Sequence, residues 1–122
     1  MDLTDEYIIK VLEDLTVRAL AIHPFPSYGR IGSIKALSDL GIGWHTYGEV
    51  QRELCKYHKT GNVFIFDLSR SYPQIIEKDE KTNLIRIKPD AFRVISKHID
   101  RYTKQILNAI QEAKAKSVDP NR

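Results

Sequence analysis

The sequence predicts an α+β domain that is mainly helical, and three observations support this fold class. Apolar residues recur at helical spacing in two long segments, one near each end of the 122-residue chain. Capping and stop signals mark shorter helices between them. Two strand-like runs, 74–78 and 84–88, are separated by a polar stretch and predict a β-hairpin. We expect a single domain, residues 1–122, made of an N-terminal helix, a central core, a C-terminal helix and a disordered tail: 4–23, 34–88, 90–113 and 114–122.

The two terminal helices carry apolar stripes with heptad spacing. In the C-terminal helix, apolar residues follow one another at steps of three and four without a break, as in a coiled-coil seam. Thr4 can cap the N-terminal helix, and Pro89 with Asp90 suits the start of the C-terminal one. Either both stripes pack on the central domain, or they form a homodimer interface, which we favour because one small core has little surface to cover them. The predicted interface residues are Ile8, Leu12, Leu15, Phe92, Ile95, Ile99, Tyr102, Ile106 and Ala109.

Signals for two shorter helices lie in the central core. Ser33 opens a short helix over 34–40, which Gly41 closes as the C-terminal glycine. Thr46-Tyr47-Gly48-Glu49 matches a capping box. This box predicts a second helix over 47–57.

The segment 62–71 leaves two interpretations open. Its first part, 63–66, has strong strand propensity. As a helix, the segment places most of its apolar residues on one face, with Phe66, Ser69 and Arg70 mainly on the other. We favour the helix because it completes a known order of elements.

That order is a helix, a short extended piece, two further helices and a hairpin: 34–40, 42–44, 47–57, 62–71 and 74–88. It resembles the winged helix-turn-helix superfamily. The flanking helices make the chain look like small bacterial and archaeal regulators of the PadR type, which dimerise through added terminal helices. The resemblance implies that the third helix enters the major groove of double-stranded DNA and that the hairpin is the wing. It therefore implies a dimeric transcriptional regulator that binds DNA sequence-specifically and is not an enzyme.

Candidate DNA contacts are the basic, amide and small polar side chains near the third helix and the hairpin. The free amides at a helix start bind phosphate, which favours the segment 59–62. Arg70 and Asn62 have the side-chain types that read base edges, and Ser69 can assist. Polar residues of the hairpin can follow the DNA backbone. The predicted DNA-binding residues are Tyr47, Lys59, Thr60, Asn62, Ser69, Arg70, Lys78, Lys81, Thr82, Asn83 and Arg86.

The strand interpretation of 63–66 moves the predicted contacts to another helix. If this stretch is a strand, the helix over 47–57 becomes the one that reads DNA. The residues that would then contact DNA are His45, Tyr47, Gln51, Arg52 and Lys56.

The charge distribution favours a polyanionic partner. The formal net charge is +3; residues 1–27 hold five acids and two bases, whereas residues 88–122 hold four acids and eight bases. A basic C-terminal part suits nucleic acid. Against this, Glu77, Asp79 and Glu80 in the predicted hairpin would repel phosphate. The alternative function is therefore a winged-helix adaptor that binds protein partners in a replication, segregation or transcription assembly.

The sequence predicts neither a metal site nor a cofactor. Cys55 and His58 have C-x-x-H spacing, but structural zinc needs four ligands, and the remaining candidates lie far away in sequence. Cys55 is the single cysteine, so no disulfide forms within the chain, and we expect it and Trp44 in the core. The acidic start of the chain, without any apolar run of membrane-spanning length, predicts a cytoplasmic protein with no membrane partner.

Overall fold

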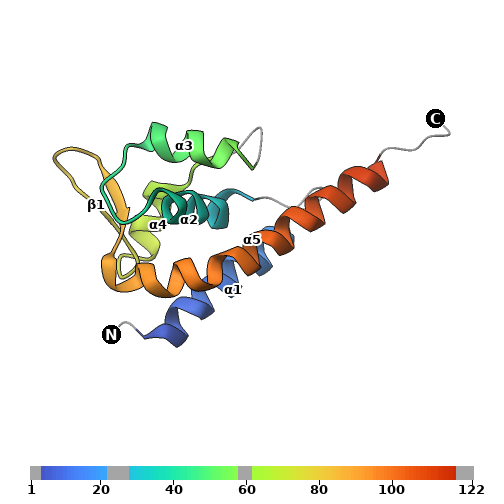
Figure 1. The fold of residues 1–122 in the computed structure, drawn as a ribbon, viewed down its shortest axis with the longest axis horizontal. Helices are drawn as coiled ribbons and strands as arrows, with labels where there is room; N and C mark the ends of the chain where they lie inside the picture. The colour runs from blue at the N-terminus through green and yellow to red at the C-terminus, as the bar shows by residue number, and fades with distance from the viewer. Residues whose placement is uncertain (1–3, 22–27, 58–61, 118–122) are drawn as a thin grey trace.

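The computed structural model describes residues 4–21, 28–57 and 62–117 of the chain. These residues form five helices and one two-stranded antiparallel sheet, which confirms the mainly helical α+β class (Figure 1). In chain order the elements are α1 (Asp5–Leu20), α2 (Gly29–Leu40), α3 (Tyr47–Cys55), α4 (Ile65–Ser71), β1 (Ile76–Lys78), β2 (Ile85–Ile87) and α5 (Pro89–Ser117).

The predicted helix caps of α1 and α3 are confirmed. The Thr4 side chain accepts a hydrogen bond from the backbone N–H of Tyr7 at 3.1 Å, which satisfies one of the free donors at the start of α1. Thr46 and Glu49 form both hydrogen bonds of a capping box at the start of α3. Local sequence signals thus determine where these two helices begin.

The predicted start of α2 was wrong. The helix begins at Gly29, four residues before Ser33. Ser33 is fully buried and donates its hydroxyl to the carbonyl of Gly29 at 2.9 Å, so it lies inside the first turns. The same hydroxyl accepts a hydrogen bond from the backbone N–H of Phe64 at 3.2 Å. Ser33 therefore joins α2 to the segment before α4 instead of capping a helix.

The helix interpretation of 62–71 is confirmed for its second part only. Helix α4 covers Ile65–Ser71 and has no side-chain cap, because Phe64 occupies the N-cap position. Asn62 lies outside the helix and is exposed. The segment 63–66 is not a strand, since only Ile76–Lys78 and Ile85–Ile87 form strands in the described chain.

The hairpin is joined by a third extended residue from the loop between α2 and α3. Strand β1 pairs antiparallel with β2, with Glu77 opposite Arg86. His45 forms an isolated bridge with Ile85, and both backbone hydrogen bonds of this bridge measure 2.9 Å. Asn83, in the loop of the hairpin, has a φ of 59°, a left-handed conformation that asparagine tolerates well. The loop before α3 is thereby attached to the outer edge of the hairpin.

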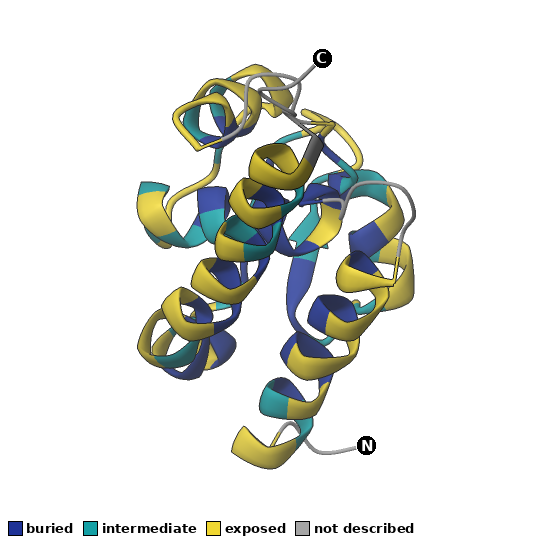
Figure 2. Ribbon diagram, turned by 90° about the vertical axis from the view of Figure 1, so that its right-hand side faces the viewer, coloured by how far each residue is buried: buried dark blue, intermediate teal, exposed yellow. Residues whose placement is uncertain are grey.

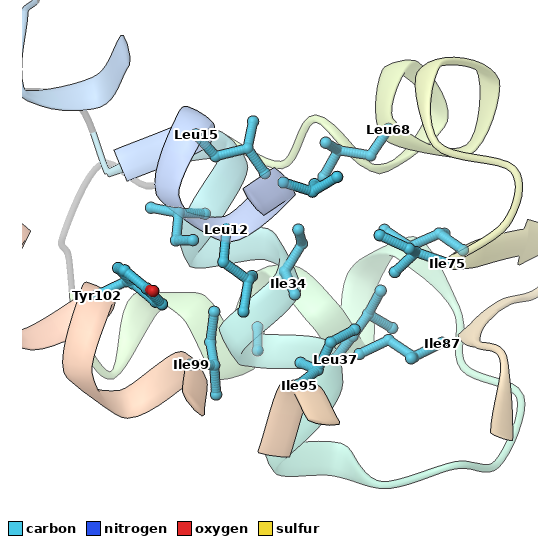
Figure 3. Packing of buried hydrophobic residues seen from close by; sticks show 14 of the residues in the cluster. Leu12, Leu15, Ile34, Leu37, Leu68, Ile75, Ile87, Ile95, Ile99 and Tyr102 are labelled. Atoms are coloured by element: carbon cyan, nitrogen blue, oxygen red, sulfur yellow. The ribbon is translucent and has the colours of Figure 1, made fainter. Parts of the chain in front are cut away.

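The apolar stripes of the two terminal helices pack inside one chain, and the prediction that they form a dimer interface was wrong. Helix α1 packs mainly on α5, and α5 also packs on α2. Leu12, Ile34 and Ile99, one from each of these helices, converge in the same part of the core (Figure 3). The predicted interface residues that are buried in this way are Ile8, Leu12, Leu15, Ile95, Ile99, Tyr102 and Ile106; Phe92 and Ala109 are half-buried.

The physical reason is that α1 and α5 cover each other. Each helix turns its buried side chains inward and leaves its polar side chains exposed (Figure 2). An amphipathic face needs an apolar partner, and a helix from the same chain serves as well as a second copy. The stripes are therefore covered within a single chain.

Two residues expected in the core are exposed. The side chain of Trp44 is 40% exposed, because it lies on the outer side of the hairpin, where the Arg86 guanidinium is 4.5 Å from its ring centroid. Cys55 follows the buried Leu54 on α3 and is exposed. Neighbouring side chains of a helix point in directions about 100° apart around its axis, so a residue next to a buried one can be exposed.

Helix α5 continues past its predicted end at residue 113. It reaches Ser117, because the alanines and lysines there are strong helix formers. The prediction of a disordered tail over 114–122 was therefore wrong for 114–117, and residues 118–122 lie outside the described part. None of the described helices is long and apolar enough to span a membrane.

Candidate nucleic-acid interface

Helix α4 and strand β1 enclose an open hollow that unites two groups of predicted contacts. The hollow is lined by Phe66, Ser69, Arg70, Lys78 and Glu80, and we call it the α4–β1 hollow. Ser69 and Arg70 were predicted from the third helix, and Lys78 from the hairpin. The fold brings these three polar side chains to one place.

The burial of α4 determines which of its side chains reach the hollow. Ile65 and Leu68 are buried, which turns Phe66, Ser69 and Arg70 outward. This is the division of faces that the helix interpretation predicted. It follows from helical periodicity alone, since residues three and four apart share a face.

Arg70 is the most exposed base of the hollow. Its side chain is 78% exposed, and its Nη2 lies 3.3 Å from a carboxylate oxygen of Asp67. Its Nε also donates to the carbonyl of Phe66 at 3.4 Å. An exposed ion pair of this kind contributes at most about 1 kcal/mol, so a phosphate or a base edge can replace Asp67 at little cost.

Phe66, which lines the hollow, belongs to an aromatic stack. The rings of Tyr47 and Phe66 are stacked with centroids 5.8 Å apart. The Tyr47 hydroxyl donates to the carbonyl of Val63 at 3.3 Å, which ties the start of α3 to the segment before α4. The Lys78 ammonium lies 4.7 Å from the Phe66 centroid and 3.9 Å from a carboxylate oxygen of Glu80. Lys78 is therefore held by the Phe66 ring and by the Glu80 carboxylate.

The tip of the hairpin presents exposed polar residues in a defined loop. Lys81, Thr82 and Asn83 are all exposed. The Asp79 side chain accepts a hydrogen bond from the backbone N–H of Lys81 at 3.0 Å. This bond, helped by hydrogen bonds from Thr82, holds the pKa of Asp79 below its usual value. Asp79 therefore stays ionised beside Lys81, as expected of an acid that weakens a phosphate contact.

Arg86 does not belong to the α4–β1 hollow. It is paired in register with Glu77, and the two side chains form an ion pair on the outer face of the hairpin. Successive side chains of a strand point to opposite faces, so Glu77 and Lys78 face away from each other. Arg86 and Lys78, both predicted DNA contacts of the hairpin, therefore lie on different faces of it.

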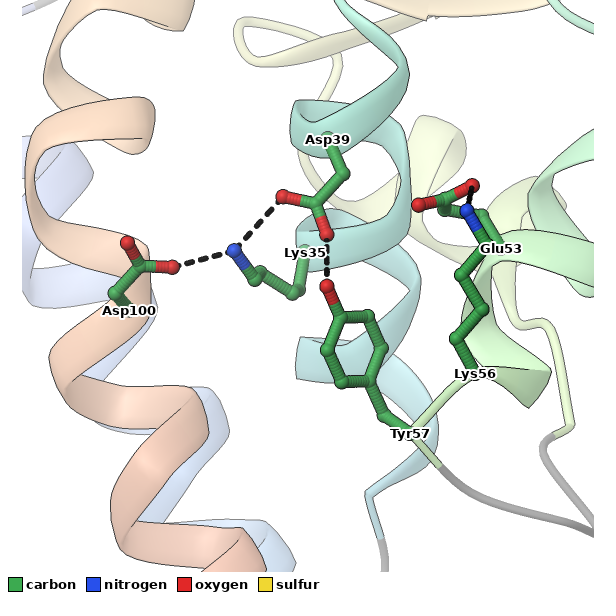
Figure 4. Close-up of polar contacts among 6 residues, drawn as sticks. All are labelled: Lys35, Asp39, Glu53, Lys56, Tyr57 and Asp100. Atoms are coloured by element: carbon green, nitrogen blue, oxygen red, sulfur yellow. Dashed lines mark hydrogen bonds and ion pairs between the residues drawn. The ribbon is translucent and has the colours of Figure 1, made fainter.

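The alternative set of contacts on α3 occupies another part of the surface. Arg52 and Lys56 line a separate hollow with Leu40, Glu49 and Glu53. The Lys56 ammonium lies 2.9 Å from Glu53 (Figure 4). His45 is half-buried, with its Nδ1 3.5 Å from Glu49, and Gln51 is exposed. Of the other predicted DNA contacts, Lys59 and Thr60 lie outside the described residues.

Across the described part of the chain, no group of three or more His, Cys, Asp or Glu side chains is arranged to hold a metal ion. His58 lies outside that part. Comparison with known proteins found no matching family model, no matching curated protein and no matching solved structure.

Proposed function

We propose that this protein binds double-stranded DNA through the face that α4 shares with the hairpin, as a regulator of transcription with a winged-helix core. The single observation that carries the proposal is the α4–β1 hollow. It gathers an arginine, a serine and a lysine from two elements next to a hairpin tip of small polar and basic residues. Side chains of these types bind base edges and phosphates.

The order and connection of the elements support the winged-helix part of the proposal. Helix α2, the bridge residue His45, helices α3 and α4, and then the hairpin follow one another as in that superfamily. The bridge between His45 and Ile85 supplies a third extended element beside β2. In such an arrangement, α4 is the helix that enters the major groove and the loop 79–83 is the tip of the wing.

We assign different tasks to the exposed bases of this face. Arg70, which an exposed ion pair and one long hydrogen bond hold, reads a base edge in the groove. Lys81, at the hairpin tip, contacts a phosphate. A lost base contact weakens binding to the preferred sequence, whereas a lost phosphate contact weakens binding to all sequences alike.

A homodimer, as in regulators that bind palindromic sites, remains part of the proposal. Because the heptad stripes are buried within the chain, a second copy would contact side chains that are still exposed. Val17 and Leu20 are 66% and 39% exposed and line an open hollow between α1 and α5. Light scattering of the purified protein at micromolar concentration measures this directly, and a monomer would remove the dimer from the proposal.

The experiment that tests DNA binding is selection from a pool of random duplexes, followed by titration of the selected sequence. We expect Arg70→Ala to cost about 1–3 kcal/mol on that sequence and to relax base preference at one position. We expect Lys81→Ala to weaken binding to all sequences and to lower the salt slope by about one. Arg52→Ala is the matched control, since Arg52 lies on the separate α3 hollow.

Each outcome of this experiment has a defined meaning. If Arg52→Ala loses specificity while Arg70→Ala does not, α3 rather than α4 reads the DNA. If no duplex is selected and none of the three variants changes binding, the proposal of a DNA-binding regulator is wrong.

A second candidate function is a protein-binding adaptor, and one observation favours it. The loop between α2 and α3 exposes Ile42 and Trp44, which are 48% and 40% exposed. Exposed apolar side chains that lie close together mark protein interfaces more often than phosphate contacts. Val63, whose exposure would have added to this case, is buried. If the protein binds a partner protein with an affinity that salt leaves unchanged, and Trp44→Ala abolishes that binding, the adaptor function is favoured.

A further inference from the structure

The net positive charge of this chain is carried by α5. Helix α5 contains six lysines and arginines and three acids, whereas the rest of the chain contains thirteen of each. The formal net charge of +3 therefore equals that of a single helix. An uneven distribution of this kind produces a directed field, even though the net charge of the molecule is small.

Four of the six bases form a stripe along α5. Arg93, Lys97, Arg101 and Lys104 follow at steps of four, four and three residues, which return to one side of an α-helix. All four are exposed, and the buried positions of α5, such as Ile95 and Ile99, lie on the opposite side. We call these four residues the α5 stripe. It is about 16 Å long, from the helical rise per residue.

The acid nearest to the middle of the stripe is engaged elsewhere. Asp100 lies between Lys97 and Lys104 in sequence, where a free carboxylate would pair with either of them. Its side chain instead forms an ion pair with Lys35 of α2 (Figure 4). Lys35 also lies 2.8 Å from Asp39, whose other oxygen accepts a hydrogen bond from Tyr57 at 2.6 Å. Asp100 is thus paired with α2, and it forms no ion pair with a described base of the stripe, although its side chain is 72% exposed.

The members of the stripe differ in how they are held. Arg93 pairs with Asp5 of α1 at 3.1 Å, and the Arg101 guanidinium lies 4.5 Å from the ring centroid of Tyr102. Lys97 and Lys104 have no ion pair with any residue that the structure describes. These two lysines are the bases most available to an external anion.

We propose that the α5 stripe is a second DNA-binding surface, which contacts the phosphate backbone of a duplex without regard to sequence. The inference rests on the proposed function for the choice of duplex DNA among polyanions. All four members of the stripe are charged, and exposed apolar side chains, Val17 and Leu20, share a hollow with Arg101 alone among them. Protein interfaces, in contrast, depend on buried aromatic and apolar anchors. An anionic membrane is the other polyanionic surface, but amphipathic helices bind it through an apolar face, and the apolar face of α5 is buried in the core.

The stripe lies on a different side of the molecule from the α4–β1 hollow. Helix α5 packs on α2 through its buried face, and α2 packs on α3 and α4 in turn. Figure 1 shows α3 and α5 on opposite sides of α2. The two surfaces are therefore open to separate tests.

The test compares two double variants that lower the net charge equally. Lys97→Gln with Lys104→Gln removes the two free bases of the stripe. Lys10→Gln with Arg18→Gln removes two exposed bases of α1 that, like Lys97 and Lys104, have no ion pair with any described residue, and is the control. Binding to a random-sequence duplex is measured against salt concentration. We expect the stripe variant to bind about tenfold more weakly at about 0.1 M salt, with a salt slope lowered by about two, and the control to match the wild type.

Failure of this inference is distinguishable from failure of the proposed function. If the stripe variant keeps the wild-type salt slope while Arg70→Ala loses specificity, the stripe is not a DNA-binding surface and the α4–β1 hollow still is. If the stripe variant loses binding while Arg70→Ala changes nothing on any sequence, the inference stands and the proposed function fails. If the wild type binds no duplex, or the stripe variant loses binding only to vesicles of anionic lipid, the inference is overturned.

Discussion

The α4–β1 face and the outer face of α5 both present bases, but the bases have different neighbours. On the first face, Arg70 pairs with Asp67 and Lys78 lies near Glu80. On the second, Arg93 pairs with Asp5, but Asp100 is paired with Lys35 of α2, and Lys97 and Lys104 have no ion pair with any described residue. A base with an adjacent acid must exchange partners before it binds phosphate, whereas a free base only loses water and counterions. If both faces bind DNA as proposed, we therefore expect the unpaired lysines of α5 to contact phosphate at a lower cost than the paired bases of the α4–β1 face.

The strongest change in stability is expected from a substitution on the inner face of α5, compared with one on its outer face. Ile99→Asp places an unpaired charge among α1, α2 and α5, and we expect it to lower the free energy of unfolding by at least about 3 kcal/mol. The matched variant on the outer face, Lys97→Gln, is expected to change stability by less than about 0.5 kcal/mol. Chemical denaturation measures both. An Ile99→Asp variant that keeps the stability of the wild type would contradict the burial of Ile99 in the core of the chain.

A substitution at Gly32 is expected to change both stability and sequence-specific binding, because it disturbs the packing of α2 on α3. A Cβ at Gly32 would lie 2.7 Å from Leu54 of α3 and 2.9 Å from the Tyr28 ring. We expect Gly32→Ala to destabilise the fold by about 1–3 kcal/mol through this crowding, offset by about 1 kcal/mol from the better helix propensity of alanine. Thermal unfolding measures the stability. In the folded variant, sequence-specific binding should weaken more than the salt-dependent binding of the α5 stripe, and an equal loss of both would contradict the separation of the two surfaces.

A smaller effect follows when the acid beside Arg70 is removed. Asp67→Asn leaves the arginine without its ion-pair partner and removes a charge that repels phosphate. We expect duplex affinity to rise by about two- to fivefold, since an exposed pair of this kind is worth less than about 1 kcal/mol. Glu112→Gln on α5, outside the stripe, is the control and should change affinity less. Unchanged affinity in Asp67→Asn would show that the α4–β1 face lies away from the DNA.

The smallest effect concerns the link between α2 and α5. Burial acts to lower the pKa of Lys35, but hydrogen bonds to Asp100 and Asp39 outweigh it and raise the pKa above the ordinary value of 10.5. A raised folded-state pKa means that the stabilisation is complete below pH 10.5 and is lost as the pH rises through the folded-state value. The free energy of unfolding of the wild type, measured against pH, should therefore fall more steeply in this alkaline range than that of Lys35→Gln.

The same variant also tests the α5 stripe at neutral pH. Lys35→Gln releases Asp100, which can then pair with Lys97 or Lys104. We expect a modest loss of affinity for random-sequence duplexes, and Lys35→Arg, which keeps the ion pair, should restore it. A loss that Lys35→Arg does not restore would point to a structural effect of the substitution.

Much of the secondary structure could be predicted because its signals are local. The steps of three and four in α1 and α5, and the caps at Thr4 and Thr46, depend on residues within one or two helical turns. The same periodicity predicted that Phe66, Ser69 and Arg70 share one face of α4, and all three line the α4–β1 hollow. Which side chains share a face of a helix could therefore be predicted from local sequence alone.

The tertiary structure alone decided what each face meets. A heptad stripe shows that a helix buries one side, but it does not show what covers that side. In this chain α1 and α5 pack against each other, so each covers the stripe of the other. Asp100 belongs to the most basic helix, yet it is paired with a lysine 65 residues away in sequence. Trp44 lies outside the core, and its contact is the Arg86 guanidinium of β2, 4.5 Å from its ring centroid. Such partners are distant in sequence, and periodicity and caps hold no information about residues that only the folded chain brings together.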